Sequence, residues 1–131
     1  MIVNAIGNYS GTVLFDATAL THSVAFKIET GGAWTIKVEP VSSARAWSGS
    51  GKLSGAGDDV IRLTTPPSGL TTATMTHAGK ANFIVYAYTS DGLAAVRANE
   101  IGHFSGQVQL PDGTVLLAVT ADGAWTVTPD A

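Results

Sequence analysis

The sequence predicts an all-β protein, an antiparallel β-sandwich with internal pseudo-symmetry. Three observations lead to this fold class: apolar residues that alternate with period two, turn signals along the whole chain, and a half-motif that occurs at both ends. Regular short strands separated by Gly, Pro and Asp-Gly turns are typical of sandwiches and barrels. At 131 residues the chain has the length of one ordinary domain, and we expect a single β-sandwich domain over residues 1–131.

The repeated half-motif is the strongest of these observations. Residues 4–13 read NAIGNYSGTV and residues 99–108 read NEIGHFSGQV, which is six identities in ten positions. The tetrapeptide GAWT at 32–35 returns at 123–126, displaced by 91 residues rather than 95, so the first copy has a loop four residues longer. A repeat decides architecture. What recurs is Gly, Ser, Trp and Val rather than acids or bases, so no duplicated active site is predicted.

The first half-repeat, residues 2–40, is expected to form about four strands. Apolar side chains alternate with other residues over 24–28 and over 34–38, as in a sheet with one buried face. Trp34 and Trp125 occupy the same repeat position, and we expect both to anchor the core. A half-unit of four strands cannot cover its own apolar face, so we expect the two copies to face each other in one sandwich.

Three further segments complete the predicted domain. Residues 41–57 are a Ser/Gly-rich connector with room for one edge strand, and residues 58–96 are three strands with no counterpart in the first half. Within them, NFIVYAYTS (82–90) is apolar on both faces and is placed centrally. Residues 97–129 are the second half-repeat. Leu93–Glu100 (LAAVRANE) contains good helix formers, but its repeat partner MIVNA is β-branched, so a strand is predicted.

Several short motifs resemble a known kind of module. They are GDDVIRL (57–63), TATMTHAG (72–79), NFIVYAY (82–88), NEIGHFSG (99–106) and ADGAWTV (121–127). These resemble β-sandwich modules found, often in tandem, in exported actinobacterial proteins and in their phages, which are similar in style to jelly-roll carbohydrate-binding and prepeptidase C-terminal modules. The resemblance covers residues 57–129 as a whole module, with 2–40 matching its second half. It implies a jelly-roll-like sandwich and no functional residues.

Composition excludes several classes of function. Charged residues make up 13% and the net charge is −3, with scattered basic residues, which disfavours nucleic-acid binding. There are no cysteines, and apolar stretches fall far short of the ~18 residues of a membrane span, so no membrane insertion is expected. The first residues lack a signal-peptide pattern, and we expect synthesis in the cytoplasm without an export signal.

The sequence offers no catalytic, cofactor-binding or metal-ligating set, and we expect no enzyme and no cofactor. His22, His77 and His103 lie far apart, and no nucleophile elbow, triad or carboxylate pair is recognisable. Asp58-Asp59, beside a Gly-rich loop, leaves two interpretations open, a calcium site or turn capping, and capping is favoured.

The candidate contact residues are aromatic. Trp47 has no repeat partner and lies among Ser and Gly, where it either stacks on a sugar or partner protein or packs over a sheet edge, which is favoured. Tyr86 and Tyr88 share one face of the central strand, as a binding patch or a polar-tipped core layer.

These features favour a structural or interaction module with protein partners, virion proteins or other copies of the chain, most concretely an accessory phage virion protein such as a capsid decoration protein or tail appendage. The alternative is a carbohydrate-binding module, extracellular or on a cell surface, whose partner is a glycan.

Overall fold

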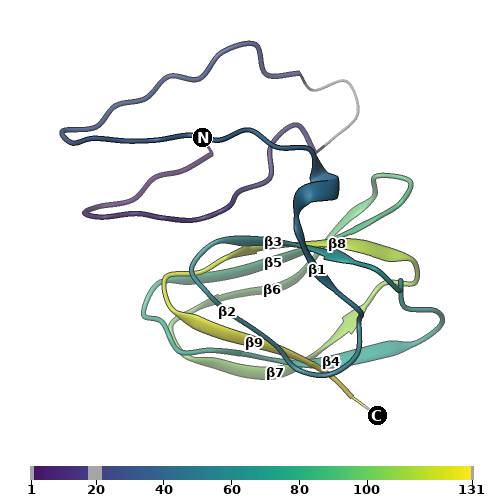
Figure 1. Ribbon diagram of the computed structural model, residues 1–131. Coiled ribbons are helices and arrows are strands. Elements are labelled where there is room, and N and C mark those ends of the chain that lie inside the picture. Colours follow the sequence, from purple (N-terminus) through teal and green to yellow (C-terminus); the bar gives the residue numbers. More distant parts are fainter. Residues whose placement is uncertain (1, 18–21, 131) are drawn as a thin grey trace.

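Nine strands within residues 45–129 form the folded part of the computed structural model, which describes residues 2–17 and 22–130. The strands are β1 (Arg45–Trp47), β2 (Leu53–Ala56), β3 (Asp59–Leu63), β4 (Thr71–His77), β5 (Asn82–Thr89), β6 (Ala94–Ile101), β7 (Phe104–Leu110), β8 (Thr114–Thr120) and β9 (Ala124–Pro129). A single 3-10 turn, η1 (Val41–Ser43), precedes β1 (Figure 1). No α-helix occurs in the described ranges.

The strands build two sheets packed face to face, which confirms the predicted β-sandwich. One sheet has the order β1-β3-β8-β5-β6 and the other β2-β9-β4-β7. All strand pairs are antiparallel except β1 with β3. From β2 to β5 each strand crosses to the opposite sheet, β5 and β6 form a hairpin, and β7–β9 cross again, which is the strand order of a jelly roll.

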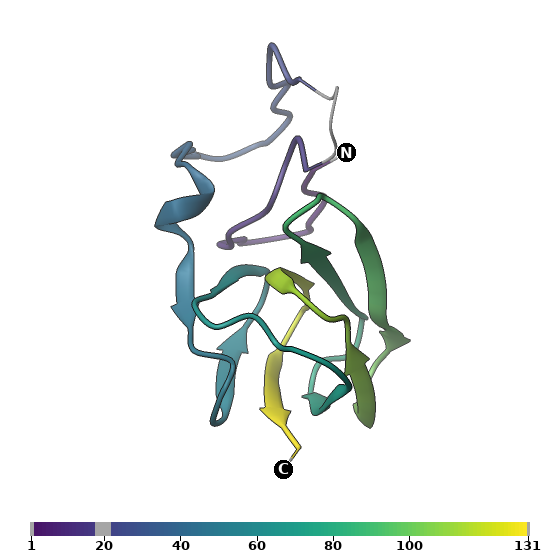
Figure 2. The same cartoon turned by 90° about the vertical axis from the view of Figure 1, so that its right-hand side faces the viewer.

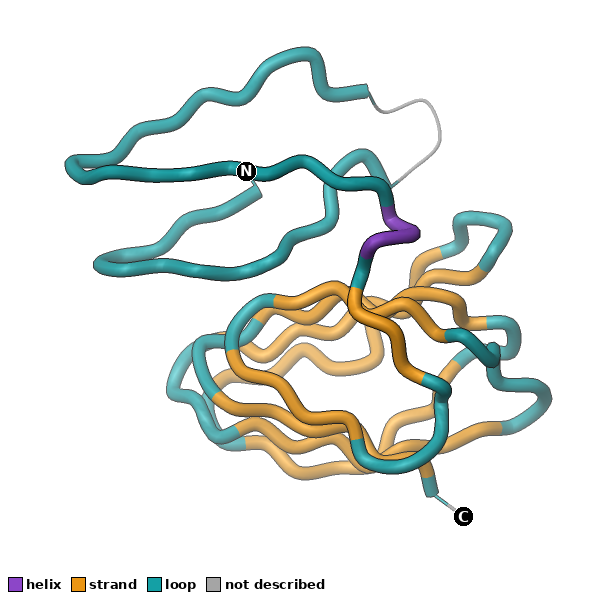
Figure 3. Tube along the Cα trace, in the orientation of Figure 1, coloured by secondary structure: helices purple, strands orange, loops and turns teal. Residues whose placement is uncertain are grey.

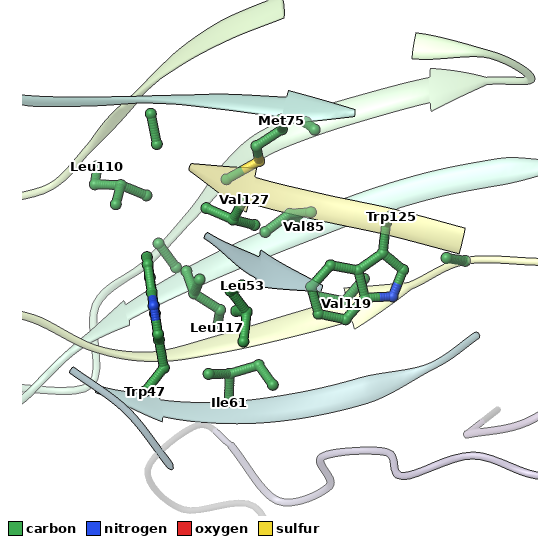
Figure 4. Packing of buried hydrophobic residues seen from close by; sticks show 14 of the residues in the cluster. Trp47, Leu53, Ile61, Met75, Val85, Leu110, Leu117, Val119, Trp125 and Val127 are labelled. Carbon is green, nitrogen blue, oxygen red and sulfur yellow. The ribbon is translucent and has the colours of Figure 1, made fainter. Parts of the chain in front are cut away.

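Period-two alternation builds the core between the sheets. In β4 the side chains of Ala73, Met75 and His77 are buried and the intervening threonines are not; in β9 Trp125 and Val127 are buried. Figure 4 shows Met75, Trp125 and Val127 facing residues of the opposite sheet, which are Ile61, Val85, Leu117 and Val119. The burial of such apolar surface is the main stabilisation of the sandwich.

Several local predictions are confirmed. The segment LAAVRANE is extended, as strand β6, and β5 and β8 each pair on both sides within their sheet. The connector 41–57 contains two short edge strands, β1 and β2, where room for one was predicted. Residues 58–96 contain β3, β4, β5 and the start of β6.

The prediction of about four strands in residues 2–40 is wrong for the part that the structure describes. We call residues 2–40 the arm. Its described residues contain no strand and follow two long extended loops beside the sandwich, as the coil colouring of Figure 3 and the side view of Figure 2 show. The two repeat copies therefore do not face each other in one sandwich: only the second, 97–129, contributes strands. That the arm and the sandwich unfold as one domain stays a prediction.

Candidate interaction surface

The arm exposes the apolar side chains that its repeat partner buries. Continuing the displacement of 91 residues from the GAWT motif places Trp34 opposite Trp125 and Ile36 opposite Val127. Trp34 is 57% exposed and Trp125 is 1% exposed; the values for Ile36 and Val127 are 53% and 0%. The prediction that Trp34 anchors the core is therefore wrong, and the same prediction for Trp125 is confirmed.

The exposed apolar side chains fall in two stretches of the arm, residues 2–9 and 24–38, whereas residues 13–17 are half-buried. Ten exposed large hydrophobic side chains fall within residues 2–40, against six in the rest of the described chain. Between described residues, the one backbone–backbone hydrogen bond made by residues 2–39 runs from the Thr12 N–H to the Asp58 carbonyl, at 3.2 Å. A contiguous apolar segment with free backbone donors and acceptors is typical of a binding element.

A small set of contacts docks the beginning of the arm on the sandwich. The Tyr9 hydroxyl donates to Asp58 Oδ2 at 2.7 Å, and Asp58 Oδ1 accepts from the Ala121 N–H at 3.0 Å. Burial first, and then the hydrogen bond to the Asp58 carboxylate, raise the pKa of Tyr9. Both oxygens of Asp58 are thus engaged in joining the arm to the turn before β9. We call the contacts of Tyr9, Asp58 and Ala121 the clasp.

Next to the clasp, the arm and the outer face of the five-stranded sheet line a small apolar pocket. Leu14 and Phe15 of the arm and Leu116 and Tyr88 of the sheet line a volume of about 180 Å³. The one acid in the lining, Asp16, already accepts two hydrogen bonds at 2.7 Å from the backbone N–H and the hydroxyl of Ser23, and they lower the pKa of Asp16. The described lining is mainly apolar, so the pocket offers apolar contact to a ligand.

The structure places Trp47 in the core rather than on the surface. It is 7% exposed, its Nε1–H donates to the Ser50 carbonyl at 3.1 Å, and its ring belongs to the core cluster beside Leu53 and Ile61 (Figure 4). Its burial fits the favoured interpretation, packing over the edge of the sheets. A ring in this position offers little surface to a sugar.

Tyr86 and Tyr88 do share one face of β5, the outer one. Their ring centroids are 6.3 Å apart, and Tyr86 is 40% exposed. Burial, and then the neighbouring Tyr86, raise the pKa of Tyr88. The two residues form a small aromatic patch at the margin of the arm, and their role in ligand contact stays a prediction.

Of the three histidines, His77 has structural partners. His77 is buried and stacks on Phe83 at a centroid distance of 4.8 Å; its Nδ1 lies 2.7 Å from the Gly102 carbonyl. Its Nε2 lies 3.1 Å from Asp122 Oδ1, close enough for an ion pair but not aligned as a hydrogen bond. We therefore treat this contact as a weak orienting one.

The acidic pair Asp58-Asp59 is likewise committed to structure. Asp59 Oδ2 pairs with Arg45 at 3.3 Å, and Asp59 Oδ1 accepts from the Val60 N–H. These contacts agree with turn capping. Among the described residues, no group of three or more His, Asp or Glu side chains could hold a metal ion, and no helix has the length and hydropathy to cross a membrane.

Sequence reasoning missed the clasp and the exposure of the arm. Tyr9 and Asp58 are 49 residues apart, so no local pattern could pair them. The repeat could have indicated that the arm would be exposed. It aligns the arm with β7–β9, whose partner strands β2–β5 have no equivalent in residues 2–40. Neither a protein-family model, nor a curated protein, nor a solved structure matches the chain.

Proposed function

We propose that this chain is a non-catalytic structural and interaction module, a β-sandwich that associates with other polypeptides through its arm. The observation that carries the proposal is the contrast between a closed core and an arm whose tryptophan and β-branched side chains are exposed. Apolar surface of this extent is stabilised when a partner removes it from water.

The most concrete setting is an accessory virion protein, a capsid decoration protein or tail appendage. The resemblance of residues 57–129 to modules of actinobacterial phages supports it, as does a weakly charged surface suited to packing against protein. Mass spectrometry of purified particles tests the setting. We expect the chain at a copy number that matches a capsid or tail symmetry, and its absence from particles would refute the virion role.

A carbohydrate-binding role is the second candidate, and the Tyr86–Tyr88 patch favours it. Exposed aromatic rings stack on sugar faces. Isothermal titration with a panel of cell-wall glycans should then detect binding that is lost in Tyr86→Ala and kept in Leu70→Ala, an exposed apolar control in the loop before β4. Binding unchanged by Tyr86→Ala, or no binding at all, would eliminate this candidate.

A further inference from the structure

The arm has the sequence and the local geometry of half a sandwich whose other half is missing. We propose that the arm docks a first half-module, a polypeptide segment whose strands match β2–β5 of this chain, and that the two together form a second jelly-roll sandwich. The proposal rests on the interaction role proposed above and is independent of the virion setting.

The correspondence runs through three strands. Residues 9–15 align with β7, residues 23–29 with β8 and residues 33–38 with β9. Large apolar residues of the arm occupy the repeat positions of buried core residues. The pairs are Phe15 and Leu110, Phe26 and Leu117, Ile28 and Val119, in addition to Trp34 and Trp125 and to Ile36 and Val127. The arm therefore carries apolar counterparts of the large core side chains that β7 and β9 contribute to one sheet and β8 contributes to the other.

The topology explains why these residues form no strands here. In the folded copy, β7 pairs with β4, β8 lies between β3 and β5, and β9 lies between β2 and β4. The strands β7, β8 and β9 never pair with one another. In the folded copy such a segment hydrogen-bonds only to β2–β5. The arm contains no equivalents of these strands, so its described residues form no strand pairs.

Two local features at the start of the arm match the folded copy. Gly7 has φ +84° and its repeat partner Gly102 has φ +83°, the left-handed conformation that favours glycine. The Tyr9 ring lies against Gly11 as the Phe104 ring lies against Gly106, where an added Cβ would approach Phe104 Cζ to 2.8 Å. This pre-organisation lowers the entropic cost of docking.

The number of half-modules within residues 1–131 argues against a second copy of these residues as the occupant. Within these residues each copy has one set of strands β2–β5, at 53–89, and two second halves, the arm and residues 104–129. If copies exchanged second halves, each β2–β5 set would still pair with only one of them. One second half per copy would remain unpaired, however many copies assembled. Only a polypeptide that brings an additional first half-module can cover the arm.

The folded copy also indicates how the occupant is recognised. The Trp125 ring lies over Gly55 of β2, and its Nε1–H donates to the Gly57 carbonyl at 2.9 Å. The partner strand opposite Trp34 therefore needs a glycine to seat the ring and a carbonyl two residues later to accept its N–H. Strand addition of this kind combines backbone pairing with side-chain pockets.

The experiment supplies a first half-module in register. A second copy of residues 41–98 is fused directly before Asn4 of this chain. Asn4 occupies the repeat position of Asn99, so the junction keeps the register of the folded copy. Hydrogen exchange is then followed by mass spectrometry. We expect amides in residues 9–15, 23–29 and 33–38 to exchange at least about tenfold more slowly than in the unextended chain. Residues 104–129 serve as the internal reference and should be unchanged.

The matched control carries Gly55→Val only in the added segment, which fills the seat for Trp34 and should return the arm to fast exchange. Equally fast exchange in the extended and unextended chains would overturn the proposal. So would concentration-dependent oligomers of the unextended chain with a protected arm, since the occupant would then be a second copy. Either failure leaves the particle measurement, and with it the virion role, intact.

Discussion

Residues 33–38 and 124–129 are similar short sequences that lie in two different environments. Both begin Ala-Trp-Thr and continue with a β-branched residue, yet Trp125 lies in the core and Trp34 lies in solvent. Residues 33–38 (AWTIKV) favour a strand at least as strongly as residues 124–129 (AWTVTP). The difference therefore comes from neighbouring strands: β9 lies between β2 and β4, and the described arm has no such partners. β-structure depends on context more than on the segment itself.

The largest expected effect is the asymmetry between the two tryptophans. Trp125→Ala should lower the free energy of unfolding by about 3–5 kcal/mol, because it removes a fully buried ring and leaves a cavity. Trp34→Ala should change it by less than about 0.5 kcal/mol. Urea denaturation followed by circular dichroism measures both, and equal losses would show that the arm is part of the same core.

A smaller loss is expected where a glycine seats the buried ring. Gly55→Ala places a Cβ inside the space of the Trp125 indole and should cost about 1–3 kcal/mol by overpacking. Gly32→Ala is the matched control, since a Cβ at Gly32 meets no atom within 4 Å. Thermal denaturation compares the two variants, and a neutral Gly55→Ala would mean that the ring can shift.

Removal of the clasp should affect the arm alone. Tyr9→Phe deletes the hydroxyl that donates to Asp58 and should weaken docking of the arm by about 1 kcal/mol, the net value of one hydrogen bond. Limited proteolysis should therefore cut residues near the start of the arm faster, with the unfolding midpoint of the sandwich unchanged. Tyr86→Phe, on the exposed patch, controls for loss of a hydroxyl.

The smallest expected effect is the contribution of Asp122 to stability, which depends on pH. The Lys80 N–H, followed by the Ala81 N–H, lowers the pKa of Asp122, whose repeat counterpart in the arm is Gly31. Because the folded pKa lies below the unfolded value of about 3.9, the stabilisation is present above that pH and is lost as pH falls through the folded pKa.

Asp122→Asn should therefore reduce the melting temperature slightly at pH 6 and have no further effect at low pH, where the wild type has lost the same contribution. Differential scanning calorimetry across pH 2–6 tests this. A constant difference between the two proteins over the whole range would assign the effect to geometry rather than to ionisation.

The sequence predicted the sandwich well where partner strands follow in the same chain. The repeat position of Trp125 identified a core residue of β9, and the repeat with MIVNA corrected the helical appearance of LAAVRANE. Alternation over 24–28 and 34–38 predicted strands that the structure lacks, because a pattern states what a segment can bury but not whether its partner is present.

The candidate contacts were less predictable. Trp47 belongs to a strand of three residues among Ser and Gly, too short for a periodic signal, so its burial depended on the distant contacts of β1 with β3. Tyr86 and Tyr88 were assigned correctly to one face, since residues two apart in a strand share a side of the sheet. Their outward direction depended on which face the other sheet covers.

The short edge strand β1 has a mechanical consequence. The arm is joined covalently to the sandwich only through η1 and β1, and three residue pairs hold β1 on β3. Tension applied to a docked arm would therefore load β1 first and pull on Trp47, which closes that end of the core. The strand β1 would detach from β3 before the other strand pairs separate. Tension on the arm would then be released while most of the sandwich stays folded.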